Sequence, residues 1–90
     1  MKRLYGMELF VEVARARSFS RAADELCVTQ SAVSHQIRAL EAFLGKSVLI
    51  RRGQRISLTE EGDVLYSVVA DCFNRMRSVT NHLMEQGSVM

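Results

Sequence analysis

The segment "TQSAVSHQIRALEAFLG", residues 29–45, constrains the fold most because it carries both ends and the buried face of one helix. Thr29 is a good N-cap, and Gly45 stands where a left-handed residue commonly ends a helix. Between them, apolar positions spaced by 4, 3 and 4 residues are Val33, Ile37, Leu40 and Leu44. This spacing predicts an amphipathic helix over 30–44 that packs against a core.

Two shorter helices are predicted before this segment. The first covers about residues 4–16, and its expected buried stripe is Met7, Phe10, Val11 and Ala14. The stretch "RSFS" breaks the pattern, and Ser20 is the expected N-cap of a second helix, "RAADELC". The two adjacent alanines of that helix allow another helix to approach closely. These elements indicate a mainly α domain.

The hydrophobic period changes after the long helix. "SVLIRR" and "RISL" are rich in β-branched and long apolar residues, and "GQ" between them is typical of a turn. A two-stranded hairpin over 47–58 is therefore predicted. Thr59 then caps a fourth helix whose first turn is acidic, the sign favoured at a helix amino end.

The fourth helix carries a seam of apolar residues with heptad-like spacing. Its members, at intervals of 3, 4, 4, 3 and 4, are Leu65, Val68, Cys72, Met76, Val79 and Leu83. The part near 65–69 is expected to dock on the core. Beyond about residue 72, the preceding chain offers too little surface to cover the seam, so we expect this helix to form a homodimer.

The net charge of +2 is small, but the basic residues are unevenly distributed. Residues 1–20 sum to +2, 21–45 to −1, 46–58 to +4 and 59–90 to −3. The hairpin segment contains no acidic residue, and its basic residues are Lys46, Arg51, Arg52 and Arg55. A solvated face normally mixes both signs, so this patch favours an anionic partner.

Composition argues against several other classes of protein. Ninety residues fit one domain without a separate catalytic domain beside it. No apolar run approaches the roughly 18 residues of a membrane span, and no signal-type core is present, so a cytoplasmic location without membrane contact is expected. Cys27 and Cys72 are too few and too distant for a metal site, and their apolar surroundings predict buried, reduced thiols.

Helix, short helix, turn, longer helix and basic hairpin are the layout of a winged helix-turn-helix, whose longer helix enters the major groove of DNA. The polar side chains that could contact base edges there are Gln30, Ser31, Ser34 and His35. Arg38, one turn further on, is better placed for a phosphate. Thr29 acts first as a cap, although a cap can also contact phosphate.

Two stretches carry a family resemblance. "FSRAADELCVTQSAVSHQIRALEAFLG" followed by "VLIRRGQRISLTEEG" resembles the amino-terminal DNA-binding domain of the LysR-type transcriptional regulators, from about Leu9 to Gly62. The Ala-Ala pair, "TQSAVS", the closing glycine and "LT" before the last helix keep the family's spacing. The resemblance implies a bacterial, non-enzymatic regulator that binds double-stranded DNA at imperfect inverted repeats.

The resemblance also implies an organisation. Residues 1–59 would form the DNA-binding domain, with the helix-turn-helix at 19–38 and the wing at 47–58. Residues 60–90 would form a linker helix that pairs two subunits, truncated before a carboxy-terminal domain that binds a small-molecule effector. No cofactor is implied for the fragment, and the full-length protein could assemble as a tetramer.

Carried over residue by residue, the resemblance assigns phosphate contacts to Ser20 and Arg21 and wing contacts to Arg51, Gln54 and Arg55. The base-facing positions match Gln30, Ser31, Ser34 and His35. This chain departs from the family at Ser31, where proline is common, and at His35, where arginine is common and carries more charge at neutral pH. Arg52 adds charge to the wing, but its contact is not inherited.

The same residues bear on other functions. Ser34 and His35 are adjacent, but neighbouring helical side chains point about 100° apart and no acid orients the imidazole, so catalysis is not expected. A winged helix can also serve as a protein-interaction or dimerisation module without DNA, although such a module would not need a basic wing. A thiol-based redox sensor is a third possibility, but neither cysteine has a basic residue directly beside it.

Overall fold

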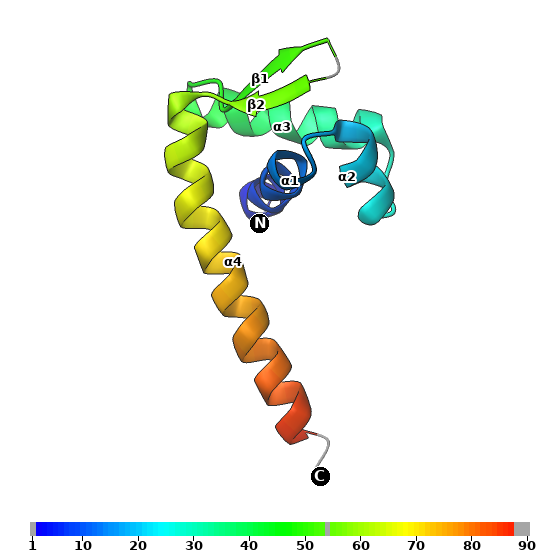
Figure 1. The fold of residues 1–90 in the computed structure, drawn as a ribbon, viewed down its shortest axis with the longest axis vertical. Helices are drawn as coiled ribbons and strands as arrows, with labels where there is room; N and C mark the ends of the chain where they lie inside the picture. Colours follow the sequence, from blue (N-terminus) through cyan, green and yellow to red (C-terminus); the bar gives the residue numbers. More distant parts are fainter. Residues whose placement is uncertain (1, 54, 88–90) are drawn as a thin grey trace.

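The computed structural model describes residues 2–53 and 55–87, which form four helices and a two-stranded sheet (Figure 1). The elements in chain order are α1 (Lys2–Ala16), α2 (Phe19–Glu25), α3 (Gln30–Leu44), β1 (Leu49–Arg52), β2 (Arg55–Leu58) and α4 (Glu60–Gly87). We call α1 to α3 with the hairpin the head. The molecule measures 50 by 25 by 22 Å because α4 extends well beyond the head. The predicted winged helix-turn-helix with a long fourth helix is confirmed.

Helix α1 is the centre of the core, since it contacts α2, α3, α4 and β2. Of the four residues expected in the buried stripe, Phe10 and Val11 are fully buried, whereas Met7 and Ala14 are half-buried. Leu9 and Val13, which the stripe did not include, are as buried as Phe10 and Val11. The predicted stripe is therefore part of a wider buried arc that it did not include in full. Helices that pack around α1 from several sides bury a wider arc than a surface helix does.

Helix α2 begins two residues earlier than predicted, and its N-cap is Ser18 rather than Ser20. Ser18 has the extended backbone of a cap (φ −160°, ψ 127°), and its hydroxyl accepts a hydrogen bond from the Arg21 N–H at 3.1 Å. Phe19 is 7% exposed and becomes the first helical residue. Burial of this aromatic ring against the core decides between the two serines, and Ser20 lies exposed within the first turn.

The turn between α2 and α3 explains why the prediction of a buried Cys27 was wrong. The N–H groups of Cys27 and Val28 donate to the carbonyl oxygens of Asp24 (3.2 Å) and Ala23 (3.0 Å), as in a Schellman motif. Cys27 occupies the left-handed position of that motif, with φ 58°. Its side chain is consequently exposed, while Val28 is half-buried against the core.

Helix α3 agrees with the prediction. The Thr29 hydroxyl accepts from the Ala32 N–H at 3.1 Å, and Gly45 ends the helix with φ 72°. The buried residues of the helix are Val33, Ile37 and Leu40, and Leu44 is half-buried at the edge of the core. This packing leaves the polar first two turns on the surface.

The hairpin is fixed at its base to α3 and to the cap of α4. The Glu41 carboxylate on α3 accepts from the Val48 N–H at 2.8 Å and from the Leu49 N–H at 3.3 Å. The Thr59 hydroxyl donates to the Ser47 carbonyl oxygen at 2.7 Å. It also accepts from the Gly62 N–H at 2.9 Å, which confirms Thr59 as the cap of α4.

Helix α4 presents two different faces. The residues that pack on the core are Leu65, Tyr66, Val69, Ala70 and Phe73. Of the predicted seam only Leu65 belongs to this group; Val68, Met76, Val79 and Leu83 are between 53% and 58% exposed. Cys72 is also exposed, so the prediction of a buried thiol was wrong here too. No described helix is both long enough and apolar enough to cross a membrane.

Candidate nucleic-acid interface

The amino end of α3 forms the centre of the candidate interface. Gln30, Ser31 and His35 are exposed, and Ser34 is half-buried. Arg38 is exposed one turn further along the helix. Because the apolar side of α3 is held by the core, these side chains are presented together on the outer surface without any need for local unfolding.

The residues expected to contact phosphate flank this helix. Ser20 and Arg21 are exposed in the first turn of α2, and Thr29 is exposed at the cap of α3. The Thr29 hydroxyl is already used as the cap acceptor, although a hydroxyl can still donate one hydrogen bond. All three positions supply hydrogen-bond donors rather than negative charge.

A cleft of about 410 Å³ joins α2, α3 and the hairpin. Its lining residues are Ser18, Phe19, Ser20, Gln30, Arg51, Gly53 and Ile56. It thus brings together Ser20, Gln30 and Arg51, three of the residues predicted from sequence. None of the described residues that line the cleft carries a carboxylate, so the arrangement suits an anionic or hydrogen-bond-accepting partner.

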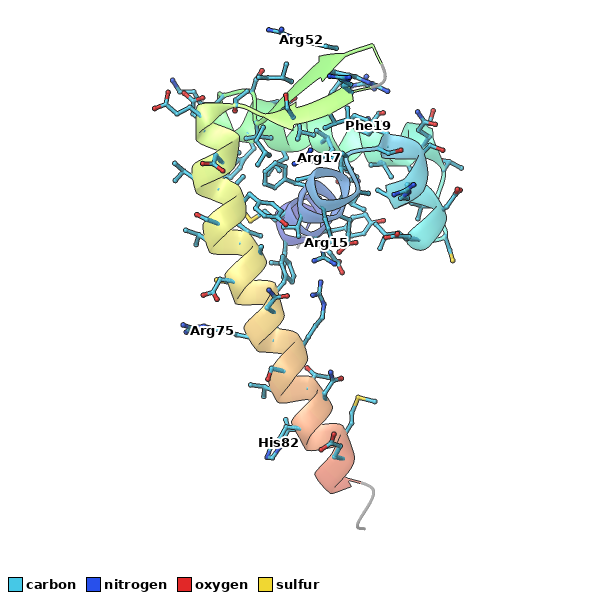
Figure 2. All side chains as sticks on the ribbon, viewed as in Figure 1. Arg15, Arg17, Phe19, Arg52, Arg75 and His82 are labelled. Atoms are coloured by element: carbon cyan, nitrogen blue, oxygen red, sulfur yellow. The ribbon has the colours of Figure 1, made fainter. Side chains whose placement is uncertain are left out.

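Arg51 is oriented by a contact that the sequence did not predict. Its guanidinium carbon lies 4.3 Å from the centre of the Phe19 ring, as in a cation–π interaction (Figure 2 marks Phe19 below the hairpin). In the sheet register Arg51 is opposite Ile56, which is 6% exposed. Opposite residues share a face of the sheet, so Arg51 belongs to the face that covers the head.

The other two wing arginines lie on the opposite face of the hairpin. Arg52 pairs with Arg55 across the strands, and both are exposed. Figure 2 shows Arg52 projecting outward from the hairpin. Gln54, which the sequence assigned to the wing tip, lies outside the described residues. The structure therefore separates Arg51 from Arg52 and Arg55, although the sequence grouped them in one patch.

Within the described part of the chain, ion pairs involve Arg15, Arg75 and Arg77. The candidate cations of the interface, Arg38, Arg52 and Arg55, take part in none of them. An unpaired arginine keeps its full electrostatic attraction for a partner. Among the same residues, no three His, Cys, Asp or Glu side chains are placed to hold a metal ion.

Two residues that support the interface were missed from sequence. The Phe19 ring contacts the Arg51 guanidinium, and the Glu41 carboxylate joins α3 by a hydrogen bond to the residue before the first strand of the wing. A buried aromatic residue between two serines is a signal that could have placed the start of α2. Glu41 gave no comparable chemical signal, because a glutamate in the last turn of an amphipathic helix is ordinarily a solvated residue.

Comparison with known proteins assigns the chain to a family. The family model of bacterial regulatory helix-turn-helix proteins, lysR family, matches residues 4–63. The glycine cleavage system transcriptional activator of Escherichia coli K12 is 41% identical over 85 residues, 94% of this chain and 28% of that protein. The transcriptional activator AmpR of Pseudomonas aeruginosa is 47% identical over 73 residues, 81% of this chain and 25% of that protein.

A similar solved structure is the BenM DNA-binding domain in complex with catB site 1 DNA. It has a TM-score of 0.81 at 30% identity and covers 91% of each chain. The present chain spans 28% of the length of the Escherichia coli relative. The matches cover both the head and most of α4, and the chain belongs to the LysR family of bacterial helix-turn-helix regulatory proteins.

Proposed function

We propose that this chain is the DNA-binding part of a transcriptional regulator, with α3 in the major groove and the hairpin on the backbone or in the minor groove. The observation that carries the proposal is the cleft in which Ser20, Gln30 and Arg51 converge beside the amino end of α3, with no carboxylate among its described lining residues. Hydrogen-bond donors and cations gathered at a helix end fit a polyanion whose base edges are also accessible.

The outer face of the hairpin supports a contact with phosphates. Arg52 and Arg55 are directly opposite each other, and like charges in that arrangement repel. Neither is paired with a carboxylate among the described residues. A phosphate between or beside them would remove this repulsion. The repulsion raises the free energy of the unbound protein, and DNA binding would lower it again. Lys46, exposed before the first strand, adds to the same positive field.

The roles of the exposed side chains follow from their chemistry. Gln30 can make paired hydrogen bonds to adenine, and Ser31, Ser34 and His35 can bond to several bases. Ser34 is half-buried, so its reach is shorter than that of Gln30. Arg38 and the α2 residues would bind phosphates and set the register of α3 rather than read sequence.

The exposed side of α4 supports a homodimer. Val68, Met76, Val79 and Leu83 lie on one stripe and leave more than half of each residue in water. A second copy would cover this stripe and place two recognition helices on an imperfect inverted repeat. We further propose a bacterial cytoplasmic location, an effector-binding domain after α4 in the whole protein, and a possible tetramer of that protein.

Selection of bound sites from random duplex DNA tests the central proposal. The expected result is a family of sites with dyad symmetry. Gln30→Ala should lose about 1–3 kcal/mol of preference for the selected sites and little affinity for random duplex, because a base contact is removed. An equal loss on both duplexes would rule out base reading by Gln30.

Arg55→Ala is the matched comparison. It should weaken binding to both duplexes and make the logarithmic salt dependence shallower by roughly one unit, because one counterion-releasing contact is lost. A salt dependence that does not change would remove the wing from the interface. Absence of binding by the unaltered protein would instead favour a winged-helix interaction module.

The dimer is tested by Leu83→Asp, with Ser78→Asp as control. Both positions are exposed on α4, but only Leu83 lies on the apolar stripe. Sedimentation should show monomers for Leu83→Asp and dimers for Ser78→Asp. Dimers that persist in Leu83→Asp would show that the stripe is not the interface.

A further inference from the structure

Glu12 is a charged residue that lies largely buried at the edge of the core. At 9% exposure it is the only charged residue classed as buried in the described part of the chain. It lies on α1, the helix that every other helix contacts. Burial of a carboxylate is costly unless it is paired, so its partners have a structural purpose.

The partners of Glu12 come from two helices. The carboxylate Oε1 lies 3.6 Å from Nη1 of Arg15 on α1 and 3.6 Å from Nη2 of Arg77 on α4. Arg77 is held further by its Nη1, which donates to the Asn74 side-chain oxygen at 2.9 Å. Arg77 therefore bridges its own helix to the centre of the head.

This bridge lies at the outer limit of the junction between head and α4. Phe73 is the last residue of α4 that packs on the core, and the described residues 74–85 are all exposed. Next to the bridge, the two elements are separated by an open groove of about 450 Å³. Its lining residues are Leu4, Tyr5, Glu8, Phe73, Met76, Arg77, Thr80 and Asn81. Close packing thus ends at Phe73, and the ion pair spans the next turn.

We infer that the Glu12–Arg77 pair sets the direction of α4 relative to α3, and thereby the spacing between the two DNA half-sites that a dimer accepts. This inference rests on the proposed function, in which two copies pair through α4. Arg77 would be a positioning residue for DNA recognition although it is remote from the DNA-facing side chains.

Because α4 extends far beyond the head, a small change in its tilt produces a large displacement of its far end. From residue 74 to its end at Gly87 the helix extends roughly 20 Å at 1.5 Å per residue. A tilt of about 10° would displace that end by roughly 3–4 Å, which is close to the rise of one base pair. Without the pair, the half-site spacing that the dimer accepts should therefore vary by about one base pair.

The second partner makes this hypothesis testable without unfolding the head. Arg15 remains beside Glu12 when Arg77 is replaced, so the buried carboxylate keeps one cation. Arg77→Met preserves the aliphatic stem and removes the charge. Arg75→Met is the matched control, because Arg75 is 80% exposed, pairs with Asp71 within α4 and points away from the head in Figure 2.

The first experiment measures the junction directly. Spin labels are placed at Cys27 and at His82→Cys, both exposed, in a Cys72→Ser background shared by every protein compared. Labelled chains are diluted with unlabelled ones so that only distances within a chain are read. Arg77→Met should broaden the distance distribution, and Arg75→Met should leave it as in the parent. An unchanged distribution in Arg77→Met would overturn the inference.

The second experiment measures binding to operators whose half-sites are moved apart or together by one base pair. Arg77→Met should discriminate between spacings roughly 1.5- to 5-fold less than the parent, the range expected for a half-exposed ion pair. Binding to a single half-site should not change, and Arg77→Lys should restore part of the discrimination. Full discrimination in Arg77→Met, or an equal loss on every operator, would contradict the inference.

The two experiments separate this inference from the proposed function. A parent protein that does not bind DNA, or stays monomeric, refutes the proposed function and with it the role in half-site spacing. The spin-label distances then still decide whether Glu12 and Arg77 hold α4 on the head. A narrow distribution in every variant refutes that role even when DNA binding is intact.

Discussion

Removal of the Glu41 side chain should loosen the hairpin from α3. In Glu41→Ala, the N–H groups of Val48 and Leu49 lose their shared acceptor, the Glu41 carboxylate. Val48 is 1% exposed, so water cannot easily replace the lost acceptor. The substitution therefore leaves a buried donor unsatisfied at the base of the hairpin, which is more costly than the loss of an exposed hydrogen bond.

The size of the effect follows from the two distances. The bond from Val48 is short at 2.8 Å and ends on a charged acceptor, a class worth about 1.5–3 kcal/mol. The bond from Leu49 is longer at 3.3 Å and adds little. We expect Glu41→Ala to lower the free energy of unfolding by about 2–3 kcal/mol and Glu41→Gln, which keeps a neutral oxygen, by about 1 kcal/mol.

Thermal unfolding at one fixed protein concentration measures this difference, because dimerisation makes the midpoint depend on concentration. Glu41→Ala should lower the midpoint by roughly 10 °C or more for a domain of this size. Glu8→Ala is the control, since Glu8 is exposed in the middle of α1 and should change stability by less than about 0.5 kcal/mol. If Glu41→Ala costs no more than Glu8→Ala, the carboxylate does not hold the hairpin.

Two further predictions concern the glycines and the thiols. An added Cβ at Gly62 would collide with the Val48 carbonyl oxygen, whereas Gly45 has open space around it and only a left-handed backbone (φ 72°). Gly62→Ala should thus destabilise the fold by clearly more than the roughly 1–2 kcal/mol expected for Gly45→Ala in denaturant titration, and equal costs would contradict the close approach. Cys27 and Cys72 are both exposed, so a thiol reagent should label both in dilute protein. At high concentration only Cys72 should become protected, and protection of neither would argue against the α4 dimer.

Local chemistry made α3 and the hairpin predictable from sequence. Thr29 and Gly45 bound an apolar stripe whose spacing matches a single helix, and each of these signals acts within a few residues. The same reasoning failed at Cys27, because an apolar neighbourhood does not reveal that the residue takes a left-handed backbone (φ 58°). A residue at the turn of a Schellman motif points outward whatever its hydrophobicity.

The remaining errors have their origin in tertiary packing. Two serines flank Phe19, and only the burial of that ring against the core selects Ser18 as the cap. Glu12 reads as a surface residue in the helical pattern of α1, and its second ion pair, with Arg77, exists only because α4 approaches α1. Pairing between strands likewise decides that Arg51 faces the head while its neighbour Arg52 faces outward.

The uncovered stripe of α4 connects the fold to the symmetry of the DNA site. Of nine exposed large hydrophobic residues in the described chain, six lie on α4, and four of these six, Val68, Met76, Val79 and Leu83, form the stripe. A contiguous apolar surface of this kind usually marks an interface. When one stripe pairs with the same stripe of another copy, the contact is isologous and has a two-fold axis. The α3 helices of the two copies are then related by the same two-fold axis. The inverted repeat proposed for the operator therefore follows from pairing of the two copies through α4.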